Sequence, residues 1–171
     1  ISDINDIHKI NHSNVKAGQD AILDLIEEAK SNIVLNALVG FVGLRPSLKT
    51  IECGKQLSLA NKESLVVAGA FMNKDNLMPI DSEHFGLWYL MQDKAVDSMI
   101  ITASGGSFRD YPLASLKDVS IKEALNHPNW SMGNKITIDS ATMTNKIYEL
   151  LEARWLFNTT KVDAIIESKS L

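Results

Sequence analysis

The sequence lacks the features of several large classes of protein. Its one cysteine, Cys53, excludes a disulfide within the chain and favours a reducing compartment. Lys and Arg together number 17 against 21 Asp and Glu, giving a net charge of −4 without any basic run. That balance argues against nucleic acid or an anionic membrane as a partner. No apolar run approaches the ~20 residues that span a bilayer.

What is present is ordinary for a folded globular protein. Hydrophobic residues make up 45% and charged residues 22% of the 171 positions, a length that suits one large domain or parts of two. The first residue is Ile, and Ile165-Ile166 predicts a strand close to the last residue. We therefore expect a fragment of a longer protein.

The first half alternates between strand and helix patterns. Apolar spacing predicts a helix over about 15–30 and another that begins near Pro46 and ends at Gly54. A buried strand is expected at 33–35, continuing toward Val39, and further strands at 57–60 and 77–80, with a helix at 65–68. This rhythm predicts βα units and a mainly parallel sheet, whose strand ends usually carry the ligand site.

The second half contains a long irregular stretch. A helix is expected at 85–91 and a strand at 96–102. Residues 104–134 then hold only one short predicted helix, 121–126, and a stretch of this kind is usually a functional lid or a disordered segment. Asp139 or Ser140 is expected to cap a long helix that ends near Phe157.

Two carboxylates follow the strand at 77–80. Asp81 and Glu83 are oxygen donors of the kind that Mg²⁺ and Mn²⁺ prefer, and at i, i+2 in an extended segment they point the same way. The alternative is that both are acids at a helix N-terminus, with Asp81 or Ser82 as the cap.

Three further groups have the residue types of a phosphate cradle, of a shared polar helix face and of a covering loop. Ser104-Gly105-Gly106-Ser107 can direct N–H groups and hydroxyls at a phosphate, or it is an ordinary turn. Asn145, Lys146 and Glu149 share one helix face, or they include only a solvated Lys–Glu pair. His127 and Trp130 can contact and cover a ligand, or they only anchor their loop. Together these groups indicate an enzyme that acts on a phosphorylated small molecule.

The sequence motifs described above also occur, in the same order, in a known protein family. From Ile33 to Phe157 the chain resembles the 1-deoxy-D-xylulose 5-phosphate reductoisomerases. The strongest matching segments are 59–65, 81–84, 104–106, Phe108-Arg109-Asp110, 127–133 and 139–145.

The resemblance implies an α/β fold in two parts. Residues 1–80 would be the second half of a Rossmann-like NADPH-binding domain, and 81–171 an α+β catalytic domain with a flexible lid. Full-length family members are homodimers, with neither nucleic acid nor membrane as partner. A bacterial cytoplasm is the implied location, with an organelle stroma as the alternative.

The resemblance also implies the reaction and its cofactors. The enzyme would use NADPH and Mg²⁺ or Mn²⁺ to convert 1-deoxy-D-xylulose 5-phosphate to 2-C-methyl-D-erythritol 4-phosphate in non-mevalonate isoprenoid biosynthesis. Because the Gly-rich first half of the dinucleotide fold does not occur in this sequence, we expect the 171-residue chain alone not to turn over.

Residue roles follow from the same resemblance. Catalytic residues would be Lys62, Glu83 and His84, and metal ligands would be Asp81, Glu83 and Glu149. NADPH would contact Asn61, Glu63 and Gly133, while Trp130 and Met132 would belong to the lid. The substrate would be bound by Lys62, Ser82, Glu83, Ser104, His127, Trp130, Ser140, Asn145, Lys146 and Glu149.

Two other functions fit the residues. One is a different metal-dependent sugar-phosphate isomerase or aldolase, which would need no hydride donor. The other is a non-catalytic binding domain, in which Asp81, Glu83 and Glu149 would be dispensable surface acids.

Overall fold

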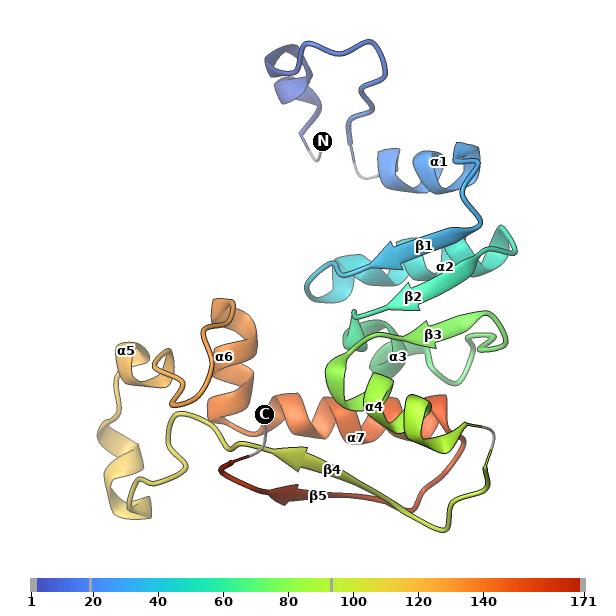
Figure 1. Ribbon diagram of the computed structural model, residues 1–171. Helices are drawn as coiled ribbons and strands as arrows, with labels where there is room; N and C mark the ends of the chain where they lie inside the picture. The colour runs from blue at the N-terminus through green and yellow to red at the C-terminus, as the bar shows by residue number, and fades with distance from the viewer. Residues whose placement is uncertain (1–2, 19, 93, 170–171) are drawn as a thin grey trace. The chain divides into compact units, whose positions relative to one another are not determined.

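The computed structural model describes residues 3–18, 20–92 and 94–169 (Figure 1). The chain divides into two compact units, one ending at Phe85 and one beginning at Gly86. The division falls within helix α4 (Ser82–Met91). The boundary between a cofactor domain and a catalytic domain at residue 80 stays a prediction.

A three-stranded parallel sheet organises the first unit, in the order β1-β2-β3 (Figure 1). The strands are β1 (Ile33–Asn36), β2 (Gln56–Leu59) and β3 (Leu77–Pro79). Leu57 of β2 lies opposite Val34 on one side and Leu77 on the other. The predicted parallel sheet is confirmed, and its strand ends lead directly into Asn61 and Asp81.

Helices precede and connect these strands. α1 (Ala21–Glu28) precedes β1, α2 (Leu44–Glu52) connects β1 to β2, and α3 (Lys62–Ala68) connects β2 to β3. Short 3₁₀ helices cover Ile4–Lys9 and Phe41–Gly43. The first helix is shorter than the predicted 15–30. After α2, Cys53 is half-buried and Gly54 has a φ of +67°, so the predicted glycine stop is confirmed.

The predicted burial of the first strand is wrong. Ile33 and Leu35 are 55% and 65% exposed, whereas Leu57 and Leu59 of β2 are fully buried. Among the described strands, β1 pairs with β2 alone, so β1 lies at the edge of the sheet that these residues form. Its apolar run resembles that of a central strand, which is why the sequence pattern suggested burial. The core of this unit lies at β2 and at Leu65 of α3.

In the second unit, β4 (Met99–Ala103) pairs in parallel with β5 (Val162–Ile166) (Figure 1). Met99, Ile101 and Ala103 of β4 are buried, while Ile100 is 55% exposed. This alternation is the period of a half-buried strand. Helices α6 (Asn134–Ala141) and α7 (Thr144–Leu156) lie in the connection between the two strands.

The single long helix predicted from residue 139 or 140 to Phe157 is wrong. The chain forms α6 and α7 instead, separated by Thr142 and by Met143, whose φ is +61°. Asp139 and Ser140 lie inside α6 and cap neither helix. Residues 104–133 are mostly irregular, as predicted, but contain a 3₁₀ helix at Leu113–Asp118 as well as α5 (Ile121–Ala124).

The helices of the described residues are all too short or too polar to cross a lipid bilayer. The architecture confirms the α/β class with parallel sheets. The flexibility of a lid stays a prediction.

Candidate functional site

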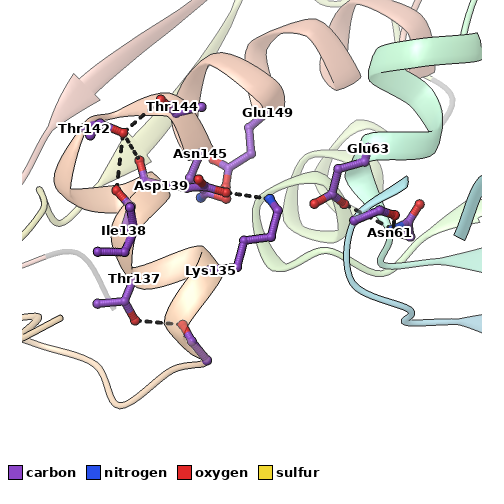
Figure 2. Close-up of polar contacts among 12 residues, drawn as sticks. Asn61, Glu63, Lys135, Thr137, Ile138, Asp139, Thr142, Thr144, Asn145 and Glu149 are labelled. Carbon is purple, nitrogen blue, oxygen red and sulfur yellow. Dashed lines mark hydrogen bonds and ion pairs between the residues drawn. The ribbon is translucent and has the colours of Figure 1, made fainter. Parts of the chain in front are cut away.

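Asn61 shapes the end of strand β2. It is the N-cap of α3, and its Oδ1 accepts a hydrogen bond from the Ser64 N–H at 3.1 Å. Its Nδ2 donates to the carbonyls of Leu38, at 2.5 Å, and Gly40, at 2.9 Å. It also donates to Glu63 Oε2 at 3.1 Å (Figure 2). The amide therefore ties the loop after β1 to the start of α3, and its hydrogen-bonding capacity is filled by the protein.

Gly43 makes this arrangement possible. A Cβ built on Gly43 would lie 2.5 Å from Asn61 Cγ and 2.6 Å from Oδ1. A side chain at this position would displace the buried amide, which has only 2% of its surface exposed. The second glycine of Gly40-x-x-Gly43 is thus required for close packing at a strand end.

Lys62, Asp81 and His84 form one buried cluster at the ends of β2 and β3. Lys62 Nζ lies 3.0 Å from Asp81 Oδ2, and His84 Nδ1 lies 3.4 Å from the same oxygen. The side chains of Lys62 and Asp81 are 9% and 16% exposed, and that of His84 is fully buried. The structure thus brings together two of the three predicted catalytic residues and one predicted metal ligand.

Asp81 is ionised in this cluster. Burial by itself raises the pKa of Asp81, but the hydrogen bond from His84 and the charge of Lys62 together outweigh burial and hold the pKa below its ordinary value. Next to it, the Ser82 hydroxyl donates to Glu83 Oε2 at 2.7 Å. An ionised carboxylate beside a second acid is the donor chemistry that a hard divalent cation requires.

In the second unit, a tight loop follows β4. Gly105 has a φ of +86°, which favours glycine, and Arg109 Nη1 donates to the Ser104 carbonyl at 2.5 Å. A Cβ on Gly106 would lie 2.2 Å from the Ser140 carbonyl oxygen. The loop and the end of α6 are therefore in backbone contact, so two segments that carry predicted substrate residues, Ser104 and Ser140, are adjacent.

The first turns of α7 hold the third predicted acid. Asn145 Nδ2 donates to Glu149 Oε1 at 2.6 Å (Figure 2), and Lys146 Nζ pairs with Glu149 Oε2. Lys146 Nζ also donates to the Thr102 carbonyl, at 2.9 Å, near the end of β4. Lys146 and Glu149 are 7% and 1% exposed. The alternative of a solvated Lys–Glu pair is therefore wrong.

His127 holds its own loop. Its Nδ1 accepts the backbone N–H groups of Asn129 and Trp130, each at 3.1 Å. Burial lowers the pKa of His127, and the nearby charge of Arg109 lowers it further, against a hydrogen bond with the Gly105 backbone that raises it; the balance lies below the ordinary value. The neutral ring accepting at Nδ1 carries its proton on Nε2.

The predicted lid residues lie between α5 and α6. Trp130 is 46% exposed, and Gly133 is the N-cap of α6, with a carbonyl that accepts the Thr137 hydroxyl at 2.9 Å (Figure 2). On the same helix, Lys135 Nζ lies 2.6 Å from Asp139 Oδ2 (Figure 2). The contact of Gly133 with NADPH stays a prediction.

The site residues thus fall into two groups, one in each unit. Lys62, Asp81 and His84 meet in the first, and Asn145, Lys146 and Glu149 meet in the second. The metal set of Asp81, Glu83 and Glu149 stays a prediction. Sequence reasoning gave no role to Arg109, although a cation three residues after the second glycine of a Gly-rich turn is a usable signal.

Parallel strands that end in buried lysines, carboxylates and glycine-rich turns define an α/β protein with the residue types of a phosphorylated-ligand site. Comparison with known proteins is more specific. Residues 3–69 match the family model described as 1-deoxy-D-xylulose 5-phosphate reductoisomerase, and residues 77–157 match the model of the C-terminal domain of the same enzyme. The chain belongs to the 1-deoxy-D-xylulose 5-phosphate reductoisomerase family.

Curated relatives carry that name. The chain is 56% identical to the enzyme of Nautilia profundicola over 100% of its own length and 49% of the relative's. It is 57% identical to the enzyme of Wolinella succinogenes over 90% of its length and 43% of the relative's. The chain therefore spans about half the length of the curated relatives it matches.

Solved structures that are similar to this chain also carry the reductoisomerase name. One is a DOX-P reductoisomerase in complex with NADPH, fosmidomycin and magnesium, with a TM-score of 0.83 and 38% identity over 91% of this chain and 43% of that chain. Another is the Zymomonas mobilis enzyme in complex with NADPH, with a TM-score of 0.77 and 39% identity over 90% of this chain and 42% of that chain.

Proposed function

We propose that the protein containing this chain converts 1-deoxy-D-xylulose 5-phosphate to 2-C-methyl-D-erythritol 4-phosphate, with NADPH as hydride donor, in isoprenoid biosynthesis. The observation that carries the proposal is 56% identity to a reductoisomerase over the whole chain. The buried clusters at Asp81 and Glu149 add support, because each places charged groups where solvent is excluded.

Asp81, Glu83 and Glu149 would hold Mg²⁺ or Mn²⁺. The residues fit such an ion, since all three are oxygen donors and the lowered pKa of Asp81 keeps its carboxylate charged. When bound, the ion supplies Lewis-acid stabilisation of negative charge that develops on substrate oxygens. Lys62 and His84 keep the Asp81 carboxylate ionised and fixed.

The phosphate end of the substrate would bind in the second unit. The donors there would be the hydroxyls of Ser104 and Ser140, the imidazole of His127, the amide of Asn145 and the ammonium of Lys146. Lys146 is held by the Thr102 carbonyl and by Glu149, so its ammonium is fixed before the ligand arrives. Binding energy from a phosphate remote from the reacting carbons can then be used to orient them.

Lys62, Glu83 and His84 would serve at the reacting carbons. Asp81 holds the Lys62 ammonium, which is a hydrogen-bond donor. The Glu83 carboxylate accepts a hydrogen bond from the Ser82 hydroxyl. Glu83 would in the same way accept a proton from a substrate hydroxyl. Together with Ser82, these residues would orient the substrate backbone.

NADPH would lie against Asn61, Glu63 and Gly133. The Asn61 amide is already bonded to the protein, so its part is to shape the loop that the cofactor contacts. Trp130 and Met132 would cover the bound substrate and exclude water from the hydride path. The full-length protein would be a homodimer in a bacterial cytoplasm.

The first experiment is an assay of the full-length protein. We expect NADPH oxidation that requires both 1-deoxy-D-xylulose 5-phosphate and Mn²⁺. Asp81→Asn and Glu149→Gln should lower kcat/KM by roughly a hundredfold or more, because changing even a residue that only supports a metal ligand typically costs about 10- to 100-fold. Glu167→Gln, an exposed acid after β5, is the matched control and should leave activity unchanged. Turnover of the sugar phosphate without NADPH would indicate an isomerase or aldolase instead.

Metal binding is tested separately by Mn²⁺ titration followed by EPR. The wild-type protein and Glu167→Gln should show saturable binding that Glu149→Gln loses. Equal Mn²⁺ affinity in Glu149→Gln would remove Glu149 from the ligand set without touching the proposed reaction.

A further inference from the structure

Arg109 has no role in the function proposed above, although it lies beside several residues that do. It follows the Ser104–Gly106 loop, and its side chain is 18% exposed. A guanidinium is permanently charged and carries five N–H donors. Because a charged group loses hydration when it is half-buried, the Arg109 guanidinium needs polar partners in the protein.

Arg109 closes the loop from both sides. Its backbone N–H donates to the Gly106 carbonyl at 3.0 Å, and its Nη1 donates to the Ser104 carbonyl at 2.5 Å. Both carbonyls that flank Gly105 are therefore turned toward Arg109. Two carbonyls of the loop are thereby bonded within the protein, and the backbone N–H groups of a glycine-rich turn are the donors that an anion-binding turn uses.

The side chain of Arg109 also occupies the space over Gly105. A Cβ on Gly105 would lie 2.6 Å from Arg109 Cδ and 2.9 Å from Cγ. The positive φ of Gly105 and the missing side chain together allow the aliphatic part of Arg109 to lie against the loop. The loop conformation and the position of the guanidinium therefore depend on each other.

The charge of Arg109 reaches the neighbouring groups. Its Nε lies 3.1 Å from Asp110 Oδ2, but Asp110 is 78% exposed, so solvent screens that pair. On the other side its charge acts on His127, a predicted substrate residue. Positive potential is thus present at the loop even with Asp110 nearby.

We propose that Arg109 is a positioning residue of the phosphate site, which holds the Ser104–Gly106 loop in its anion-binding conformation and adds positive charge to it. This inference rests on the proposed function. Arg109 acts on the phosphate through the loop, because its guanidinium donates to the Ser104 carbonyl of the loop and to Asp110.

The test uses Arg109→Met and Arg109→Lys in the full-length enzyme. Loss of a charge-assisted hydrogen bond is worth about 1.5–3 kcal/mol, or roughly 10- to 100-fold. Arg109→Met should therefore raise KM for 1-deoxy-D-xylulose 5-phosphate and the inhibition constant of inorganic phosphate by that factor, with Mn²⁺ affinity unchanged. Arg109→Lys keeps the charge without the planar fork and should recover part of the loss. Arg154→Met, an exposed arginine of α7, is the matched control.

The outcomes separate the two proposals. Unchanged KM and unchanged phosphate inhibition in Arg109→Met, in an enzyme that turns over, would overturn the role of Arg109. Should the Met variant fail to fold, the same two constants in Arg109→Lys decide: a rise of severalfold supports the role and wild-type values refute it. Wild-type protein that binds inorganic phosphate but does not turn over the sugar phosphate would contradict the proposed function instead.

Discussion

Gly106 lies at a position of the second unit where the backbone leaves no room for a side chain. Its missing Cβ leaves room for the Ser140 carbonyl and for the Ala141 backbone, which would lie 2.2 Å and 2.6 Å from an added methyl group. We expect Gly106→Ala to destabilise the protein by about 1–3 kcal/mol, since backbone rather than a flexible side chain must move. Urea unfolding of the full-length protein measures this.

Gly86 is the matched control for that substitution. It lies within α4, and a Cβ there would meet nothing within 4 Å. Because glycine costs about 0.5–1 kcal/mol relative to alanine inside a helix, Gly86→Ala should leave stability unchanged or raise it. Equal effects of the two substitutions would mean that the Gly106 contact with Ser140 is absent in solution.

His127 gives the site a predicted pH dependence. Its pKa in the folded protein is lowered from the ordinary value of 6.5, so the unfolded chain binds the proton more readily. The stabilisation from the neutral ring is therefore fully present above pH 6.5 and is lost as the pH falls through the lowered pKa. NMR titration of the imidazole checks this, and Arg109→Met should raise the measured pKa. A pKa above 6.5 in the wild type would contradict the prediction.

For single residues, the sequence predicted which side chains are functional groups better than it predicted which side chains they contact. Asp81 and Glu149 were predicted as acids of one site, but nothing in the sequence indicates that Asp81 is held by Lys62 and His84. Such pairing depends on where two strands end relative to each other. Sequence analysis named Arg109 only within the matching segment Phe108-Arg109-Asp110. Its role depends on the shape of a loop, which the sequence does not give.

At the scale of elements, the strongest prediction concerns the start of α3. Asn61→Asp keeps the oxygen that caps the helix but loses the donors to the carbonyls of Leu38 and Gly40 and to Glu63. We expect a loss of at least about 1–3 kcal/mol, from the two hydrogen bonds to carbonyls at about 0.5–1.5 kcal/mol each, because the new carboxylate also lies beside Glu63. The free energy of unfolding, from denaturant titration, measures it.

Asn73→Asp provides the comparison, because the Asn73 side chain accepts one hydrogen bond, from the Asp75 N–H at 3.0 Å, and aspartate can do the same. This exposed substitution should change stability by less than about 0.5 kcal/mol. An Asn61→Asp protein as stable as Asn73→Asp would show that the amide donors contribute little.

Elements with turn residues at their ends were the easiest to predict. Gly54 ends α2 as expected, and β2 and β3 lie within one residue of the predicted ranges. The break between α6 and α7 was missed because Thr142 and Met143 carry no glycine or proline signal. Met143 adopts a left-handed φ of +61° that local propensity disfavours, so packing must impose it.

At the scale of the whole molecule, each unit has its own core. Leu65 and Leu59 are fully buried in the first unit, and Ile101, 2% exposed, is buried in the second. Leu65→Ala and Ile101→Ala should each cost about 2–5 kcal/mol, the usual range for truncating a buried aliphatic side chain. Hydrogen exchange should rise in β1–β3 for the first variant and in β4 and β5 for the second. A uniform rise in both sheets for either variant would contradict separate cores.

The parallel α/β class was predictable because strands and helices alternate at regular spacing. The exposure of β1 was not, since the run Ile33-Val34-Leu35 has the same composition whether the strand is central or at an edge. Strand order is a non-local property, and the sequence of a single strand does not encode which neighbours it has.

The backbone contact between Gly106 and Ser140 bears on how the protein can change under selection. Resistance to an inhibitor usually arises by exchanging a side chain that the inhibitor touches. An inhibitor that contacts Gly106 would contact a position where no larger residue fits. Single substitutions at that position would therefore damage the protein and could not easily give resistance. The neighbours of Gly106 on the exposed loop, such as Tyr111 and Leu113, have no such restriction. Inhibitors anchored on the glycine turn should therefore select resistance more slowly than inhibitors anchored on those side chains.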